Sequence, residues 1–142
     1  MNALLSIRPE FARKILDGTK RYEYRKRAFA KPVERIFVYS SSPTQHIVGE
    51  IEVAFVHSAK PSAIWRKTCR QSGIQYAFFK EYFGRRSEAY AIEVASVTIY
   101  DSPVDPFVLF SRFTPPQSYM YLHEKDVERI RAIGLANITS KN

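Results

Sequence analysis

A helix ends and a strand begins within one ten-residue stretch, GTKRYEYRKR at residues 18–27. Upstream, Pro9 suits the first position of a helix, and apolar residues at helical spacing run as far as Gly18, which favours a helix end. Downstream, tyrosines alternate with charged residues at the period of two that is typical of a strand. The sequence therefore predicts a helix over residues 9–17, a sharp turn, and a strand over 21–26.

The charged side chains of this stretch form the first candidate site. The turn at Gly18 places Lys20 at the mouth of the strand, and strand alternation puts Glu23 and Arg25 on one face. A carboxylate between guanidinium groups is held ionised and oriented, which leaves Lys20 and Arg25 to meet a phosphate or the polar edge of a base. A solvated charged strand explains the same spacing equally well.

Further strands are predicted over residues 3–7, 35–40, 47–55, 89–97 and 98–104. Short amphipathic helices fit residues 64–69 and 78–83, and the aromatic stripe of the second is interpreted as core. A final amphipathic helix begins near Glu124 and ends near Gly134. Five or six strands with short helices are too little helix for a doubly wound sheet. They favour an α+β fold, a small and partly closed β-barrel with helices at its rim.

The composition, 45% hydrophobic and 25% charged, is that of a globular domain, and 142 residues suit one domain. No apolar run is long enough to span a bilayer, and the N-terminus does not resemble a signal peptide. These features predict a soluble cytoplasmic protein without a membrane partner. The single cysteine, Cys69, and three scattered histidines predict no disulfide, no zinc or other metal, and no cofactor.

The positive charge is concentrated in two stretches. The net charge is +8, and residues 13–35 hold nine basic residues against three acidic ones. Residues 60–86 hold seven against one. Such segregation favours a polyanionic partner, which would be RNA, another nucleic acid, a nucleoside or a nucleotide. A basic surface without a partner, or one that binds an acidic protein, remains an alternative.

Two other segments carry candidate ligand-binding groups. Ser40 and Ser42 lie in a serine run whose hydroxyl and N–H groups suit a phosphate, although the run is also an ordinary turn before a proline. Tyr119 and Tyr121 stand two apart after Ser118, so both can face one side and stack on a base. The alternative for these tyrosines is that they close the bottom of the barrel.

The stretch resembles a known family. Gly18, Lys20, Glu23 and Arg25 match the G-x-K-x-x-E-x-R signature of ASCH domains, which belong to the PUA-like superfamily. The resemblance continues through the predicted strands and covers roughly residues 3–122. It implies a PUA-like β-barrel at residues 1–122 with a cleft beside the motif, in a superfamily of RNA-binding and modified-base-reading modules. Residues 123–142 would then be a helix and tail packed on that domain or trailing it.

The resemblance is also compatible with an enzymatic function. One ASCH branch is similar to an amidohydrolase of N4-acylated cytidine, and its lysine corresponds to Lys20. Glu23 stands where that branch has a threonine, so the hydroxyl nucleophile is missing. Other ASCH proteins are described as ribonucleases, for which Lys20, Tyr22, Ser40 and Ser118 supply suitable groups.

The main expectation is a basic cleft that binds RNA or a nucleotide, and the alternative is a small hydrolase of RNA or N4-acylated cytidine with Lys20 as its catalytic residue. The residues expected to bind the ligand are Lys20, Glu23, Arg25, Lys26, Ser40, Ser42, Ser118, Tyr119 and Tyr121.

Overall fold

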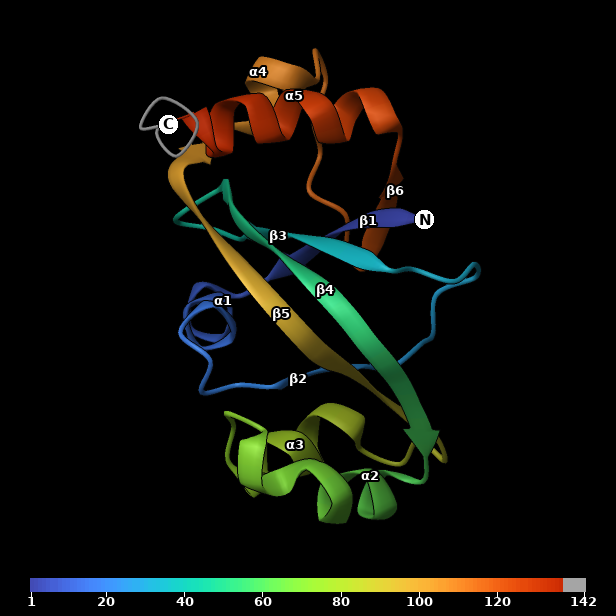
Figure 1. Ribbon diagram of the computed structural model, residues 1–142. Helices are drawn as coiled ribbons and strands as arrows, with labels where there is room; N and C mark the ends of the chain where they lie inside the picture. Colours follow the sequence, from blue (N-terminus) through green and yellow to red (C-terminus); the bar gives the residue numbers. More distant parts are fainter. Residues whose placement is uncertain (137–142) are drawn as a thin grey trace.

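The computed structural model describes residues 1–136, which form one mixed sheet with helices at both of its ends (Figure 1). The strands are β1 (Asn2–Ile7), β2 (Tyr22–Arg25), β3 (Arg35–Ser40), β4 (His46–Ala59), β5 (Ala89–Val104) and β6 (Tyr119–Leu122). The helices are α1 (Pro9–Leu16), α2 (Pro61–Thr68), a 3-10 turn at Cys69–Gln71, α3 (Tyr76–Phe83), α4 (Pro106–Leu109) and α5 (Glu124–Gly134).

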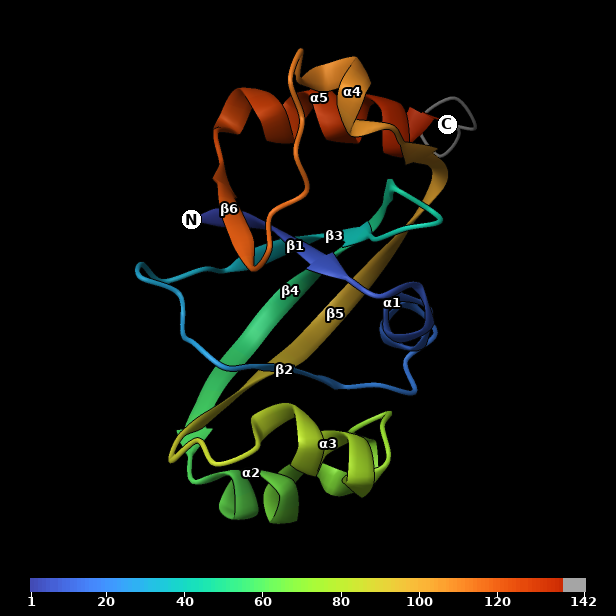
Figure 2. The ribbon, with the colours of Figure 1, turned by 180° about the vertical axis from the view of Figure 1, so that it is seen from behind.

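The six strands follow the order β2-β5-β4-β3-β1-β6, and only the β1–β3 pair is parallel. This confirms the α+β class and the expected five to six strands. The sheet is not closed into a barrel, because the edge strands β2 and β6 do not pair with each other in the described chain. Strand β2 has four residues and pairs only with β5, so a gap separates it from β1 on the face shown in Figure 2.

Two element predictions differ from the structure near the sheet's long strands. Residues 89–104 form one continuous strand instead of two, because β5 follows β4 along its whole length. The pairing shifts register between Glu52 and Val53 and again before Phe55, but the strand continues through both irregularities. The predicted strands do not include residues 119–122, yet these residues pair with β1 as β6.

The helices cover different parts of the sheet. Helix α1 packs beside the middle of the sheet, α2 and α3 lie together at one end, and α4 and α5 lie at the other (Figure 1). Helix α5 turns Val127 and Ile130 into a core cluster with residues of β1, β3 and β5, as its spacing predicts. None of the helices among residues 1–136 has the length and apolar character that crossing a membrane requires.

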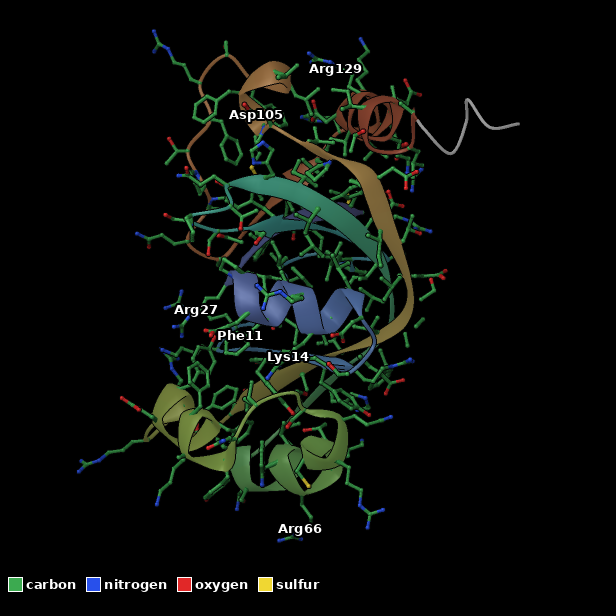
Figure 3. All side chains as sticks on the ribbon, turned by 90° about the vertical axis from the view of Figure 1, so that its left-hand side faces the viewer. Phe11, Lys14, Arg27, Arg66, Asp105 and Arg129 are labelled. Carbon is green, nitrogen blue, oxygen red and sulfur yellow. The ribbon has the colours of Figure 1, made fainter. Side chains whose placement is uncertain are left out.

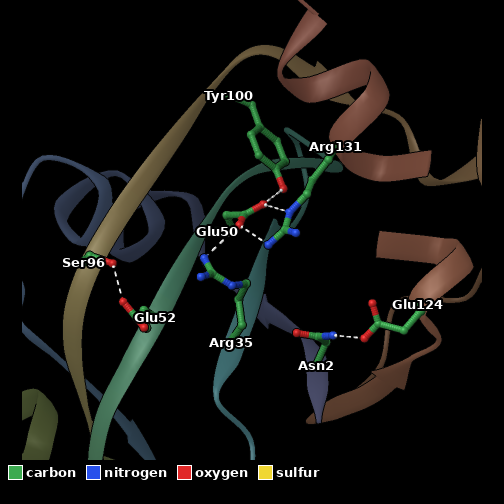
Figure 4. Close-up of polar contacts among 8 residues, drawn as sticks. All are labelled: Asn2, Arg35, Glu50, Glu52, Ser96, Tyr100, Glu124 and Arg131. Carbon is green, nitrogen blue, oxygen red and sulfur yellow. Dashed lines mark hydrogen bonds and ion pairs between the residues drawn. The ribbon is translucent and has the colours of Figure 1, made fainter. Parts of the chain in front are cut away.

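A buried carboxylate ties α5 to the sheet (Figure 4). Glu50 of β4 is 3% exposed and pairs with Arg35 at 2.9 Å and with Arg131 of α5 at 2.8 Å. Tyr100 is the third partner of this carboxylate, and its hydroxyl donates a hydrogen bond at 2.6 Å. Burial alone would raise the pKa of Glu50, but the hydrogen bonds from Arg131 and Tyr100 and the two guanidinium charges lower it.

Removing the α5 partner of this carboxylate is expected to destabilise the fold. Replacing Arg131 by methionine leaves Glu50 with Arg35 and Tyr100 alone, and we expect the free energy of unfolding to fall by about 2 kcal/mol. Urea unfolding of both proteins measures the difference. The control is Arg129→Met, an exposed arginine of the same helix (Figure 3), which should change stability by less than about 0.5 kcal/mol. Equal losses in the two variants would contradict this account.

Candidate functional site

A cavity of about 180 Å³ opens between α1, β2 and α3, beside the gap that separates β2 from β1. Figure 3 shows Phe11 and Lys14 on the side of α1 that faces the α2–α3 pair. The cavity is lined by Ser6, Ile7, Arg8, Phe11, Lys20, Glu23, Tyr24, Arg25, Ile74, Phe78 and Tyr82. Three of the residues predicted from the motif, Lys20, Glu23 and Arg25, therefore converge on one hollow. Both basic stretches of the sequence supply its walls.

Local structure after α1 carries Lys20 into this wall. Gly18 adopts a φ of +87°, and the Asp17 carboxylate accepts hydrogen bonds from the Thr19 N–H and hydroxyl. The chain then turns inward, so that Lys20 is only 1% exposed. The Thr19 hydroxyl is engaged outside the cavity lining, so it does not replace the threonine missing at position 23.

The Lys20 ammonium group has few partners for a buried charge. Its Nζ donates to the Ser72 carbonyl at 2.7 Å and lies 4.8 Å from the centre of the Tyr24 ring and 5.3 Å from that of Phe11. Burial lowers the pKa of Lys20 to about 8, although the negative charge of Glu23 acts in the opposite direction. Near neutral pH the amine is therefore a hydrogen-bond donor that can lose its proton and act as a base. Residues with pKa values shifted in this way are concentrated at functional sites.

Glu23 and Arg25 form a buried ion pair on the same strand, as the alternation predicts. Their side chains are 10% and 14% exposed, and Arg25 Nη2 lies 2.9 Å from Glu23 Oε2. Arg25 Nη2 also donates to the Ser6 carbonyl at 3.0 Å, and Nη1 to the Ser118 carbonyl at 3.5 Å. The guanidinium group thus bridges the gap between β2 and the other edge of the sheet. The ion pair uses one Glu23 oxygen, Oε2, and Glu23 belongs to the cavity lining, so the wall offers a carboxylate acceptor. The Arg25 Nε atom is buried without a hydrogen-bond partner.

The sequence did not predict that two aromatic residues line this cavity. The stripe on residues 78–83 was predicted to be core, and this holds for Phe79 and Phe83, which are 2% and 1% exposed. Phe78 and Tyr82 instead line the cavity, with their rings nearly parallel at an interplanar angle of 9°. The sequence does contain one indication of this. Phe78 and Phe79 are adjacent, as are Tyr82 and Phe83, so a helix that carries both pairs presents rings on more than one face.

Cations stand beside the aromatic lining. The exposed Arg8 places its guanidinium carbon 5.6 Å from the ring centres of both Phe11 and Phe78. Lys26, also exposed, places Nζ 4.7 Å from the centre of the Tyr82 ring. Lys26 therefore lies next to the cavity as the sequence suggested, while Arg8 was not among the candidates because it precedes the motif.

The remaining candidates lie elsewhere. Ser40 is buried at the end of β3, Ser42 is exposed in the following turn, and Ser118 contacts the site only through its carbonyl group. The hydroxyls of Tyr119 and Tyr121 accept hydrogen bonds from the N–H groups of residues 30 and 31, at 3.0 and 2.8 Å. The two tyrosines hold the loop before β3 and are not part of the cavity lining, so base stacking by them stays a prediction.

Metal ligands do not cluster in the described part of the chain. Within residues 1–136 no three side chains of histidine, cysteine, aspartate or glutamate come together in a way that could hold an ion. The chemistry of the cavity is accordingly that of a buried amine, a guanidinium–carboxylate pair and aromatic rings.

Comparison with known proteins agrees with this picture. The family model described as the ASCH domain matches residues 5–100. An ASCH domain-containing ribonuclease of Zymomonas mobilis is 24% identical over 135 residues, which are 90% of this chain and 88% of that protein.

Solved structures show the same fold. The crystal structure of ASCH from Zymomonas mobilis superposes with a TM-score of 0.87 and 22% identity, covering 93% of this chain and 94% of that one. The N-terminal domain of McrB from Staphylothermus marinus is similar at a TM-score of 0.61 and 14% identity, covering 94% of each chain. The signature at residues 18–25, the sheet that surrounds it and the match over residues 5–100 show that this chain belongs to the ASCH domain family of PUA-like proteins.

Proposed function

We propose that this protein binds RNA by taking one unpaired base into the cavity beside Lys20. The observation that carries the proposal is the combination of an aromatic hollow with a buried cation and a buried carboxylate. A cavity of about 150 Å³ holds a benzene ring, and this one, at about 180 Å³, suits a single flat ring better than a stacked pair. A base inside a duplex would have to leave the stack before it could enter.

The polar groups of the wall complement the edge of a base. Protonated Lys20 donates to a ring nitrogen or carbonyl oxygen, and the Glu23 oxygen outside the Arg25 ion pair accepts from an exocyclic amine. Arg25 keeps that carboxylate ionised and oriented, since it contacts both Glu23 and the opposite edge of the sheet. The exposed Arg8 of the cavity lining and the neighbouring Lys26 would meet the phosphates that precede and follow the base. The similarity to a protein named as a ribonuclease supports RNA as the partner.

A titration of labelled single-stranded RNA at several salt concentrations tests the proposal. We expect affinity to fall as salt rises, with a logarithmic slope of roughly −0.7 for each phosphate contacted. A free nucleotide in excess should compete, whereas the same concentration of ribose 5-phosphate should not, because it has no base. Binding that is insensitive to salt, or equal competition by the two, would contradict the proposal.

One observation favours a second function, cleavage of the bound RNA. An amine with a pKa lowered to about 8 is partly neutral at slightly alkaline pH and can act as a general base. Neutral Lys20 would take the proton of a ribose 2′-hydroxyl, whose oxygen attacks the adjacent phosphorus. The 5′-oxygen leaves with a proton from water, and a 2′,3′-cyclic phosphate remains.

The pH dependence separates the two functions, because they need opposite protonation states of Lys20. Cleavage by the neutral amine should become faster as pH rises and level off above about 8. Binding through the charged ammonium should instead weaken as pH rises through the same value. Gel analysis of end-labelled RNA and anisotropy of the same RNA, both measured from pH 6 to pH 10, give the two profiles. Cleavage that persists in Lys20→Met would exclude this residue as the base.

A further inference from the structure

The turn of residues 71–74, which leads into α3, binds two lysine side chains at adjacent carbonyl groups. Lys20 Nζ donates to the Ser72 carbonyl at 2.7 Å, and Lys14 Nζ, from α1, donates to the Gly73 carbonyl at 3.0 Å. The two lysines differ in their surroundings, because Lys20 is buried in the cavity lining, whereas Lys14 is exposed and lies outside that lining. A contact that fixes this turn therefore also fixes the hydrogen-bond acceptor of the Lys20 amine.

Contacts within the turn set its shape but not its place relative to α1. Ser72 Oγ donates to the Ile74 carbonyl at 3.0 Å and accepts from the Ile74 N–H at 3.3 Å. Two donors outside the turn hold it in place. The Arg21 N–H donates to the Gln71 carbonyl at 2.9 Å at the start of the turn, and Lys14 binds two residues further on. Of these two donors, only the Lys14 ammonium is a side-chain group that a substitution can remove.

The backbone of Lys14 holds Lys20 as well. The Lys14 carbonyl accepts from the Lys20 N–H at 3.0 Å and from the Thr19 hydroxyl at 3.4 Å. Lys14 lies on the side of α1 that faces the α2–α3 pair (Figure 3). Its carbonyl thus fixes the backbone of Lys20, and its side chain fixes, through the turn, the acceptor at the other end of the same lysine.

The charge of Lys14 also acts on the Lys20 amine. Burial is the main cause that lowers the pKa of Lys20 to about 8, and the negative charge of Glu23 opposes it. The positive charges of Lys14 and Arg25 lower this pKa further. The other groups that contact the amine are one carbonyl and two aromatic rings, those of Ser72, Tyr24 and Phe11.

We infer that Lys14 is a positioning residue of the cavity, which holds the turn at Gly73 so that the Ser72 carbonyl meets the Lys20 amine. The consequence for RNA rests on the proposed function, but the action of Lys14 on Lys20 requires no ligand. The alternative is an ordinary surface hydrogen bond, in which case Lys14 would contribute only one charge to the field of the protein.

Three variants separate these two cases. Lys14→Met keeps the length and the apolar stem of the side chain but removes its donor and its charge, and Lys14→Arg restores both. Arg13→Met is the matched control, because it removes one charge from the adjacent exposed position of α1. Among the described residues, the Arg13 side chain makes no hydrogen bond to the turn.

NMR of the full chain, labelled with ¹³C at the lysine Cε atoms, follows the titration of Lys20, and Lys20→Met assigns its signal. We expect a midpoint near pH 8 in the unmodified chain. Lys14→Met should raise the midpoint by about half a pH unit, because a repelling charge is lost and the released turn lets water reach the amine. Lys14→Arg should return the midpoint to its original value. Arg13→Met should move it by less than about 0.2 of a pH unit, because its charge is screened by solvent.

RNA binding gives the second readout. At pH 7 Lys14→Met should bind labelled single-stranded RNA about fivefold more weakly, because the amine is displaced, while its remaining binding should persist to higher pH. Lys14→Arg should restore both the affinity and the pH profile. Equal effects of Lys14→Met and Arg13→Met in the two measurements, or an arginine variant that behaves like the methionine variant, would overturn the inference.

The two readouts also distinguish this inference from the proposed function. If the chain binds no RNA but the variants titrate as expected, the proposed function fails and the positioning by Lys14 stands. If Lys20→Met loses RNA binding while Lys14→Met changes neither the titration of Lys20 nor the affinity, the positioning role is refuted and the proposed function stands.

Discussion

Lys20→Met is expected to abolish most RNA binding, lowering the affinity by about 100-fold at neutral pH. Methionine keeps the length and the apolar stem of the lysine, so the contacts with the Phe11 and Tyr24 rings are retained. What disappears is the ammonium group, which is the donor that the cavity wall presents next to the Glu23 carboxylate. In a hollow shielded from water, such a charged hydrogen bond is worth more than at the surface.

The matched control for this variant is Lys125→Met, which removes an exposed lysine from α5 at the far end of the sheet. It lowers the net charge by the same amount, so any difference between the two variants reflects the cavity and not the overall field of the protein. Anisotropy titrations with the same RNA measure both affinities. If both variants bind RNA equally well, the cavity is not the binding site.

The Lys20→Met variant is also expected to change how the stability of the protein depends on pH. The pKa of Lys20 is about 8 in the folded chain and 10.5 in its unperturbed state, because burial disfavours the charge. The unfolded chain thus binds the proton more tightly, and the contribution of this group to stability rises with pH between about 8 and 10.5. Lys20→Met should flatten the dependence of the melting temperature on pH in this window. The variant should remain folded, since it removes a buried charge and leaves no cavity.

Local sequence was enough to predict the polar half of the site. Lys20, Glu23 and Arg25 follow from a helix end, a turn and a period of two within eight residues, and the structure brings all three to one cavity. These features depend on backbone geometry close to the motif, which the residue types determine.

The aromatic half depends on packing between distant segments. Phe78 and Tyr82 face the cavity only because α3 lies against α1 and β2, and nothing in their helical spacing distinguishes the cavity face from the core face. The Glu50–Arg131 pair joins residues that are 81 positions apart in the chain. The β6 strand follows prolines and pairs with β1, more than a hundred residues away, so its local pattern gave no sign of a partner. Contacts between segments so far apart in the chain are not encoded in any local pattern of residues.

Gly73→Ala is expected to damage both the fold and the site, and it tests how Lys20 is held in place. Gly73 has a φ of +69°, and a Cβ built there would lie 2.5 Å from the Cβ of Lys20 and 2.7 Å from its Cγ. Those atoms belong to the base of a buried side chain, which cannot swing aside as the tip of an exposed lysine could. We expect a loss of about 3 kcal/mol in unfolding free energy, from left-handed strain and overpacking together.

Gly18→Ala separates the strain from the contact with Lys20. Gly18 also has a positive φ, +87°, but a Cβ there would meet nothing within 4 Å. This variant should lose only about 1 kcal/mol and bind RNA normally. Gly73→Ala, measured at a temperature where both variants are folded, should bind at least about tenfold more weakly, because the displaced ammonium no longer reaches the Ser72 carbonyl at its present position. Urea unfolding and anisotropy on the two variants decide the matter. If Gly73→Ala behaves like Gly18→Ala in both measurements, then close packing over the lysine stem does not position the amine, and its location depends on its hydrogen bond and the two rings alone.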